Sequence, residues 1–156
     1  MSQKNVEKFV RKYANLVYRV AYTMLKNQEN AEDVFQDVFT KLCTDNIFFV
    51  NEEHKKAWII RVTKNKCLDF IKRAENKRKV ELDENISDFK SNYNDNFVLD
   101  EVMKLPDKYR IVIYLFYFEG YKISEISKIL EINESTIKSQ LVKARELLKI
   151  SLKEDF

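Results

Sequence analysis

The chain's only proline and its only glycine stand at the two ends of one apolar run, and this placement constrains the fold more than any other feature. Pro106 begins the run, where a fixed φ and a missing N–H cost nothing, because the first N–H groups of a helix have no intrahelical partner. Gly120 ends it, as a left-handed residue commonly does after a helix. With so little turn chemistry in 156 residues, β-hairpins are disfavoured and we predict an all-α chain.

The segment after Gly120 contains two short amphipathic stretches separated by a tight break. The first is residues 123–130, the break is Glu131-Ile132-Asn133, and the second begins at Glu134. Two helices joined by about three residues, the second rich in short polar and basic side chains, are typical of a helix-turn-helix. The second helix of such a pair enters the major groove, so this segment predicts contact with duplex DNA.

Three amphipathic helices are expected in the N-terminal half. The first covers about residues 5–26, the second follows a cap at Asn30, and the third follows a cap at Asn51 and ends near Arg73 or Ala74. The residues of the three apolar stripes are Phe9, Tyr13, Leu16, Val20 and Met24; Val34, Phe35, Val38, Phe39 and Leu42; and Trp58, Ile59, Val62 and Phe70. Helices with one apolar stripe need partners, so we expect these to form a domain.

The charge changes sign abruptly after the third predicted helix. From Arg61 to Lys79 there are eight basic residues against two acidic ones, whereas residues 80–97 contain five acidic residues against one basic. The acidic stretch has no sustained helical period and is rich in asparagine, which is typical of a flexible linker. We therefore predict two helical domains, residues 1–79 and 97–156, joined by a flexible acidic linker at residues 80–96.

Other functional classes find little support in the residues. Cys43, Cys67 and His54 have no partner at a spacing suited to a nucleophile, and no CxxC pair indicates a metal site. We expect no enzymatic activity, no catalytic residue, no metal and no cofactor. A polar N-terminus and the lack of any apolar run near ~18 residues predict a cytoplasmic protein without membrane insertion.

Two groups of residues, one in each half of the chain, form a combined pattern. The group in the N-terminal half consists of residues 31–39 (AEDVFQDVF), 58–65 (WIIRVTKN) and 69–73 (DFIKR). The group in the C-terminal half consists of Leu105-Pro106, Arg110, Glu119-Gly120, Glu125-Ile126, Thr136-Ile137-Lys138-Ser139 and Lys143-Ala144-Arg145. A helix-turn-helix alone is common, but with both groups in this order the chain specifically resembles the extracytoplasmic-function (ECF) class of bacterial RNA polymerase sigma factors.

The resemblance implies a promoter-specificity subunit with three sites and an inhibitory anti-sigma factor as a further partner. The site for the clamp coiled coil of core RNA polymerase would consist of Asp33, Gln36, Asp37 and Phe39. The site for the minus-10 element of promoter DNA would consist of Asn65, Lys66, Lys72 and Arg73. Residues 74–79 would form a loop that pockets a flipped base. The site for the minus-35 element would consist of Thr136, Lys138, Ser139, Val142 and Lys143.

Several alternatives stay open at this level. The same polar residues would suit ordinary solvated helix faces, Phe39 suits either the core or an interface, and Trp58 suits the core better than base stacking. The main alternative function is a stand-alone dimeric helix-turn-helix regulator that binds DNA without polymerase. Three residues depart from the family pattern in the helix-turn-helix: Glu131 replaces a turn glycine, Lys122 a capping serine or threonine, and Ser127 an alanine.

Overall fold

The computed structural model describes residues 3–45, 47–80 and 97–154. Every regular element in these ranges is helical, which confirms the predicted all-α class. Such a fold suits a chain with one proline and one glycine, because a helix satisfies its own backbone hydrogen bonds and needs few tight turns.

The chain divides into two compact units, Met1–Phe89 and Lys90–Phe156. Of the predicted linker, residues 80–96, only Val80 lies within the described residues, where it ends a helix. The remainder of that segment lies outside them. The predicted domain boundaries and the linker's flexibility therefore stay predictions.

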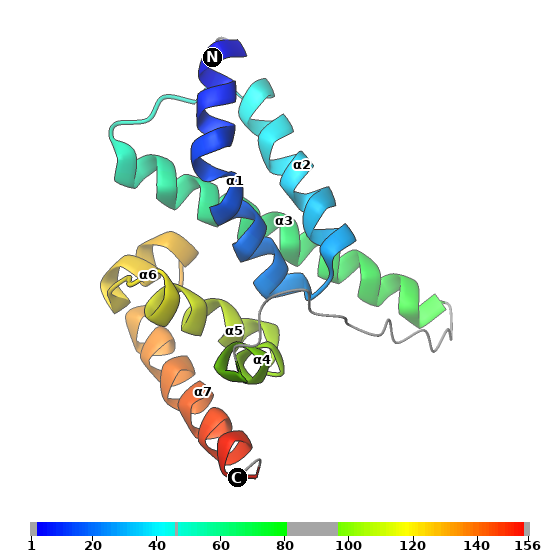
Figure 1. The fold of residues 1–156 in the computed structure, drawn as a ribbon, viewed down its shortest axis with the longest axis vertical. Helices are drawn as coiled ribbons and strands as arrows, with labels where there is room; N and C mark the ends of the chain where they lie inside the picture. Colours follow the sequence, from blue (N-terminus) through cyan, green and yellow to red (C-terminus); the bar gives the residue numbers. More distant parts are fainter. Residues whose placement is uncertain (1–2, 46, 81–96, 155–156) are drawn as a thin grey trace. The chain divides into compact units, whose positions relative to one another are not determined.

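The described part of the N-terminal unit contains the helices α1 (Gln3–Leu25), α2 (Gln28–Thr44) and α3 (Glu52–Val80). Figure 1 shows α2 returning alongside α1 while α3 crosses both, and each helix packs against the other two. The predicted stripe of α1 is buried throughout, and that of α2 is buried except at the half-buried Phe35. Removal of these stripes from water holds the three helices together.

The start of α2 lies earlier than predicted. Asn27, not Asn30, is the cap, because its Oδ1 accepts a hydrogen bond from the backbone N–H of Asn30 at 2.9 Å. Lys26 has a positive φ of 57° and ends α1, so Asn27 is the first extended residue able to begin the next helix. The cap of α3 is confirmed, since Asn51 Oδ1 accepts from the N–H of His54 at 2.8 Å.

The predicted end of α3 was wrong. The helix continues to Val80 instead of ending at Arg73 or Ala74, so residues 74–79 are helical and not a loop. These added turns contain residues of good helix propensity, and no glycine or proline interrupts them. A loop that pockets a flipped base does not exist at this place.

The described part of the C-terminal unit contains α4 (Phe97–Met103), α5 (Asp107–Ile113), the π-helical turn η1 (Tyr114–Phe118), α6 (Ile123–Leu130) and α7 (Glu134–Glu154). Helices α4, α5 and α6 each pack against the long α7 (Figure 1). The sequence did not indicate α4, whose seven residues are too few for a periodic signal. The predicted helix-turn-helix is confirmed as α6 and α7.

The apolar run that ends at Gly120 is helical as predicted, but its last turn is wider than an α-helix. In η1 the N–H of Glu119 donates to the carbonyl oxygen of Tyr114 at 3.1 Å, five residues earlier. Gly120 follows with a φ of +73°, and the N–H of Tyr121 donates to the carbonyl oxygen of Leu115 at 3.0 Å. The glycine thus closes the helix in the left-handed conformation.

The turn between α6 and α7 forms without a glycine. Glu131 takes the left-handed conformation with φ 58° and ψ 44°, which is strained for a residue with a side chain. Ser127 holds this turn: its Oγ donates to the carbonyl oxygen of Ile132 at 2.6 Å, and the N–H of Ile132 donates to the carbonyl oxygen of Ser127 at 3.1 Å. At the start of α6, Glu125 Oε1 accepts from the N–H of Lys122 at 3.0 Å and compensates for the missing cap.

We expect Glu131→Gly to raise the free energy of unfolding by about 0.5–1 kcal/mol, because relief of left-handed strain exceeds the added entropy of the unfolded chain. Urea denaturation of the full chain, followed by circular dichroism, measures the change. Glu146→Gly is the matched control, since Glu146 is exposed within α7, where glycine costs about 1 kcal/mol. Equal destabilisation by the two variants would contradict the strain at Glu131.

Candidate nucleic-acid and polymerase interfaces

Helix α7 presents one side to the core and the other to solvent. Its buried side contains Ile137, Leu141 and Ala144, each exposed by 1% or less. The residues predicted to read DNA are all exposed: Thr136, Lys138, Ser139, Val142 and Lys143. Packing of one side against the unit thus leaves the polar side accessible to a DNA groove.

The exposed half of α7 carries two lines of side chains, because successive residues turn by about 100° around a helix. One line contains Thr136, Ser139 and Lys143. The other contains Lys138, Val142, Arg145 and Lys149. Lys143 Nζ lies 4.0 Å from Glu146 Oε2, an exposed pair of the kind that stabilises little. Each line therefore offers a cation to nucleic acid.

Arg145 joins α7 to the π-helical turn. Its Nε donates to the hydroxyl of Tyr117 at 2.6 Å, and its Cζ lies 5.6 Å and 5.7 Å from the ring centres of Tyr117 and Phe116. No pattern in the sequence indicated these aromatic partners of Arg145. The contact spans 28 residues of sequence.

On α3 the structure separates the residues predicted to contact the minus-10 element into two pairs. Asn65 and Lys72, seven residues apart, are exposed on the side opposite the buried Thr63. Lys66 and Arg73, also seven residues apart, lie on a flank of the helix about 100° away. Only the first pair faces directly outward.

A groove of about 490 Å³ lies between α2 and the C-terminal part of α3. Its lining residues are Asp33, Gln36 and Asp37 from α2, and Phe70, Arg73, Ala74 and Lys77 from α3. Asp33, Gln36 and Asp37 are exposed, as the predicted polymerase site requires. Within the described residues no ion pair joins the carboxylates of α2 to the cations of α3. The surfaces predicted for polymerase and for DNA therefore adjoin at this groove.

Phe39 differs from the other residues of the predicted polymerase site. Its side chain is only 8% exposed, and its ring centre lies 4.7 Å from that of Phe35. Of the two roles left open for it, the structure places it in the core. Trp58 is half-buried and meets the ring of Phe49 edge-on at 5.5 Å, which agrees with a packing role.

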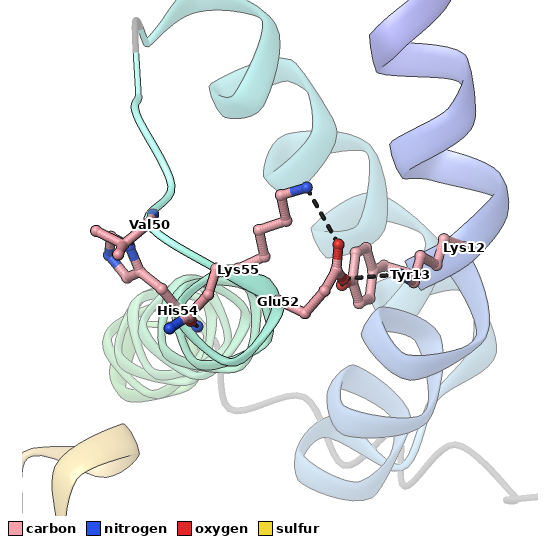
Figure 2. A network of polar contacts seen from close by, with 7 residues as sticks. Lys12, Tyr13, Val50, Glu52, His54 and Lys55 are labelled. Carbon is pink, nitrogen blue, oxygen red and sulfur yellow. Dashed lines mark hydrogen bonds and ion pairs between the residues drawn. The ribbon is translucent and has the colours of Figure 1, made fainter.

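A polar network between α1 and the start of α3 was missed by sequence reasoning (Figure 2). The carboxylate of Glu52 accepts hydrogen bonds from Lys12 Nζ at 2.7 Å, from the Tyr13 hydroxyl, and from Lys55 Nζ at 3.3 Å. These bonds, with that from Lys12 the strongest, lower the pKa of Glu52 from 4.5 to about 2. The sequence indicated Glu52 only as an acid in a first helical turn.

The loop between α2 and α3 exposes two large apolar side chains. Phe48 is 85% and Val50 is 75% exposed, while Phe49 between them packs against Trp58. The N–H of Val50 donates to Nδ1 of His54 at 3.1 Å, which ties the loop to the first turn of α3 (Figure 2). In the sequence, a run of four consecutive apolar residues outside any predicted helix could have indicated this exposed apolar loop.

Known proteins of one family match both halves of the chain. Sigma-70 region 2 matches residues 9–77, and sigma-70 region 4 matches residues 98–148. The RNA polymerase sigma factor SigV of Bacillus subtilis (strain 168) is 32% identical over 143 residues, covering 88% of this chain and 86% of that protein. The chain belongs to the sigma-70 family, in its extracytoplasmic-function class. The ECF sigma factor SigW of the same organism is 26% identical over 160 residues, covering 91% of this chain and 86% of that protein.

Solved structures share the fold of this sigma factor. The sigma factor RpoE, in complex with the anti-sigma factor NepR from Bartonella quintana, aligns with a TM-score of 0.74 at 19% identity, over 98% of this chain and 99% of that one. CnrH, in complex with the cytosolic domain of CnrY, aligns with a TM-score of 0.68 at 21% identity, over 99% of this chain and 92% of that one. At these identities the likeness concerns the fold.

This sigma factor directs promoter-specific transcription initiation with core RNA polymerase. The alternative of a stand-alone dimeric regulator is not favoured, because a DNA-binding regulator has no need of sigma-70 region 2. No helix in the described ranges is long and apolar enough to cross a membrane. The same ranges hold no group of three potential metal-ligating side chains.

We expect acid to remove the contribution of Glu52 to stability. Because the pKa in the folded chain lies below 4.5, the ionised carboxylate favours folding above that pH, and this contribution is lost as the pH falls from 4.5 towards 2. Glu52→Gln should therefore lower the urea midpoint at neutral pH, and the gap to the wild type should close over that acidic range.

Glu53→Gln is the control for this experiment, since Glu53 is the exposed neighbour in the same helical turn. Its midpoint should follow that of the wild type. A gap for Glu52→Gln that does not change with pH would contradict the assigned network.

Proposed function

We propose that this sigma factor holds promoter DNA at two places, each through one helix. A C-terminal domain of residues 97–156 binds the minus-35 element, an N-terminal domain of residues 1–79 binds and opens the minus-10 region, and residues 80–96 link them flexibly. The observation that carries the proposal is that α7 and α3 each bury one side and expose polar and basic residues on the other. Two such contacts set the position of the protein on the duplex.

In the C-terminal domain, the exposed half of α7 enters the major groove. Lys138 and Lys143 suit guanine acceptors or phosphates, the hydroxyls of Thr136 and Ser139 suit either, and Val142 suits a thymine methyl group. All five side chains are exposed, which supports this assignment.

In the N-terminal domain, the outward side of α3 holds the minus-10 region. The side-chain amide of Asn65 forms hydrogen bonds with the edge of an unpaired base. Lys72 neutralises the charge of the DNA phosphates beside that base. Lys66 and Arg73 on the flank contact neighbouring phosphates. Binding of unstacked bases offsets the few kcal/mol that unstacking costs and thereby favours the open duplex.

The acidic side of α2 binds core RNA polymerase. Asp33 and Asp37 make no ion pair in the described part of the chain, so their charge is available to a basic helical surface, and Gln36 between them offers hydrogen bonds. Phe39 supports this side from the core. Polymerase carries out the chemistry, so the sigma factor itself is not an enzyme and needs no cofactor.

We also propose that an anti-sigma factor binds this chain and that the protein acts in the cytoplasm beside polymerase and promoter DNA. RpoE supports the first point, since it aligns over most of this chain and its solved structure includes the anti-sigma factor NepR.

Transcription of genomic DNA by core RNA polymerase, with and without this protein, tests the proposed function. Mapping of the start sites should reveal a set of promoters used only when the protein is present, with shared sequences near minus-35 and minus-10. Failure to initiate anywhere in the genome would refute it.

We expect Lys138→Ala and Lys143→Ala each to weaken promoter selection by about 1–3 kcal/mol where the lysine contacts a base. Competition between matched and altered minus-35 sequences for the holoenzyme measures the loss. Lys108→Ala, an exposed lysine of α5, is the control. An equal loss on every sequence would reassign the lysines to phosphate contacts.

We expect reversal of charge in Asp33→Lys with Asp37→Lys to abolish binding to core polymerase, because both carboxylates then repel a basic partner. Titration of labelled sigma factor with core polymerase measures affinity, and circular dichroism checks that helix content is retained. Glu7→Lys, an exposed change on α1, should bind normally. Unchanged affinity of the double variant would remove this site.

A further inference from the structure

Arg145 and Tyr117 form an exposed pair of hydrogen-bond donors beside the DNA-facing half of α7. Arg145 Nε donates to the Tyr117 hydroxyl oxygen at 2.6 Å, so the hydroxyl proton remains able to donate to another acceptor. No described residue accepts from the terminal nitrogens of Arg145. Tyr117 is 54% exposed and Arg145 is also exposed. The pair therefore offers both an O–H group and the end of a guanidinium to one ligand.

Aromatic rings hold this pair in place before any ligand arrives. The rings of Phe116 and Tyr117 meet nearly at right angles, with centres 4.9 Å apart and planes at 78°. The guanidinium carbon of Arg145 lies 5.7 Å and 5.6 Å from these two ring centres. An arginine held by cation–π contacts and a hydrogen bond loses less freedom on binding than a free one.

The position of the pair indicates what it binds. Arg145 belongs to the line on α7 that also contains Lys138, Val142 and Lys149. The three cations of this line outnumber the one acidic residue that shares this side of the helix, Glu134 in its first turn. The flank of a helix inserted in the major groove runs beside a sugar–phosphate backbone. A phosphodiester carries negative charge and several acceptor oxygens. It therefore matches the pair, which carries a positive charge and offers both N–H and O–H donors.

We propose that Tyr117 and Arg145 together bind one backbone phosphate of the minus-35 duplex. This inference rests on the proposed function of α7. Tyr117 belongs to the π-helical turn and not to the helix-turn-helix, so the contact anchors the recognition helix from outside. The contact positions α7 along the groove but does not discriminate between base sequences.

The test uses holoenzyme assembled from the full chain and promoter fragments taken from the mapped start sites. Each fragment carries a single methylphosphonate, which replaces one charged phosphate with a neutral group. The wild type should lose about tenfold in affinity at one phosphate, the size of one hydrogen bond to a charged group. Tyr117→Phe and Arg145→Ala should each lose about tenfold on the unmodified fragment, with no further loss at that phosphate.

Two control variants separate this role from a structural one. Tyr109→Phe removes a hydroxyl from α5, and Lys149→Ala removes a cation from the same line of α7. Both variants should lose as much affinity as the wild type does when a methylphosphonate replaces the sensitive phosphate. Arg145→Ala should also reduce the slope of log affinity against log salt by about one.

Two results would overturn the proposal. One is a wild type that responds to no single methylphosphonate near the minus-35 element. The other is a loss of affinity at the sensitive phosphate that persists in Tyr117→Phe and Arg145→Ala. In that case the contact between the two residues would only stabilise the fold. Initiation by the wild type at the mapped promoters is established beforehand, so either result would leave the proposed function standing.

Discussion

Burial of one side of α7 is the interaction on which the C-terminal unit depends. Ile137, Leu141 and Ala144 pack inside, and the helical period then places outside the residues proposed to read DNA. The turn before α7 sets where this helix begins, because Ser127 and Ile132 exchange two hydrogen bonds across it. The packed side and the proposed DNA-recognition surface are therefore two sides of one helix.

The N-terminal unit uses the same principle with a longer element. One side of the 29-residue α3 packs against α1 and α2, while Asn65 and Lys72 remain outside. Its flank shares a groove with α2, where Arg73 and Lys77 stand opposite Asp33 and Asp37. The carboxylates proposed to bind polymerase and Arg73, which is proposed to bind DNA, therefore line one groove.

In the function proposed above, positioning and reading of DNA fall to different parts of the exposed side of α7. The line of Thr136, Ser139 and Lys143 offers donors suited to base edges, whereas Arg145 is held by the aromatic turn η1 at the other flank. Tyr117 of η1 contacts Arg145 of α7, and no local pattern in either segment reveals this pairing. The same limit applies to Glu52, whose partner Lys12 is 40 residues away.

The sequence by itself determined the all-α class, the helix-turn-helix, the apolar stripes and the family, because helical periodicity and turn chemistry act between near neighbours. It also placed the left-handed Gly120. Only the tertiary structure placed Phe39 in the core and brought Arg73 to the acidic side of α2. Those outcomes depend on packing between segments far apart in the chain, and such contacts leave no periodic trace.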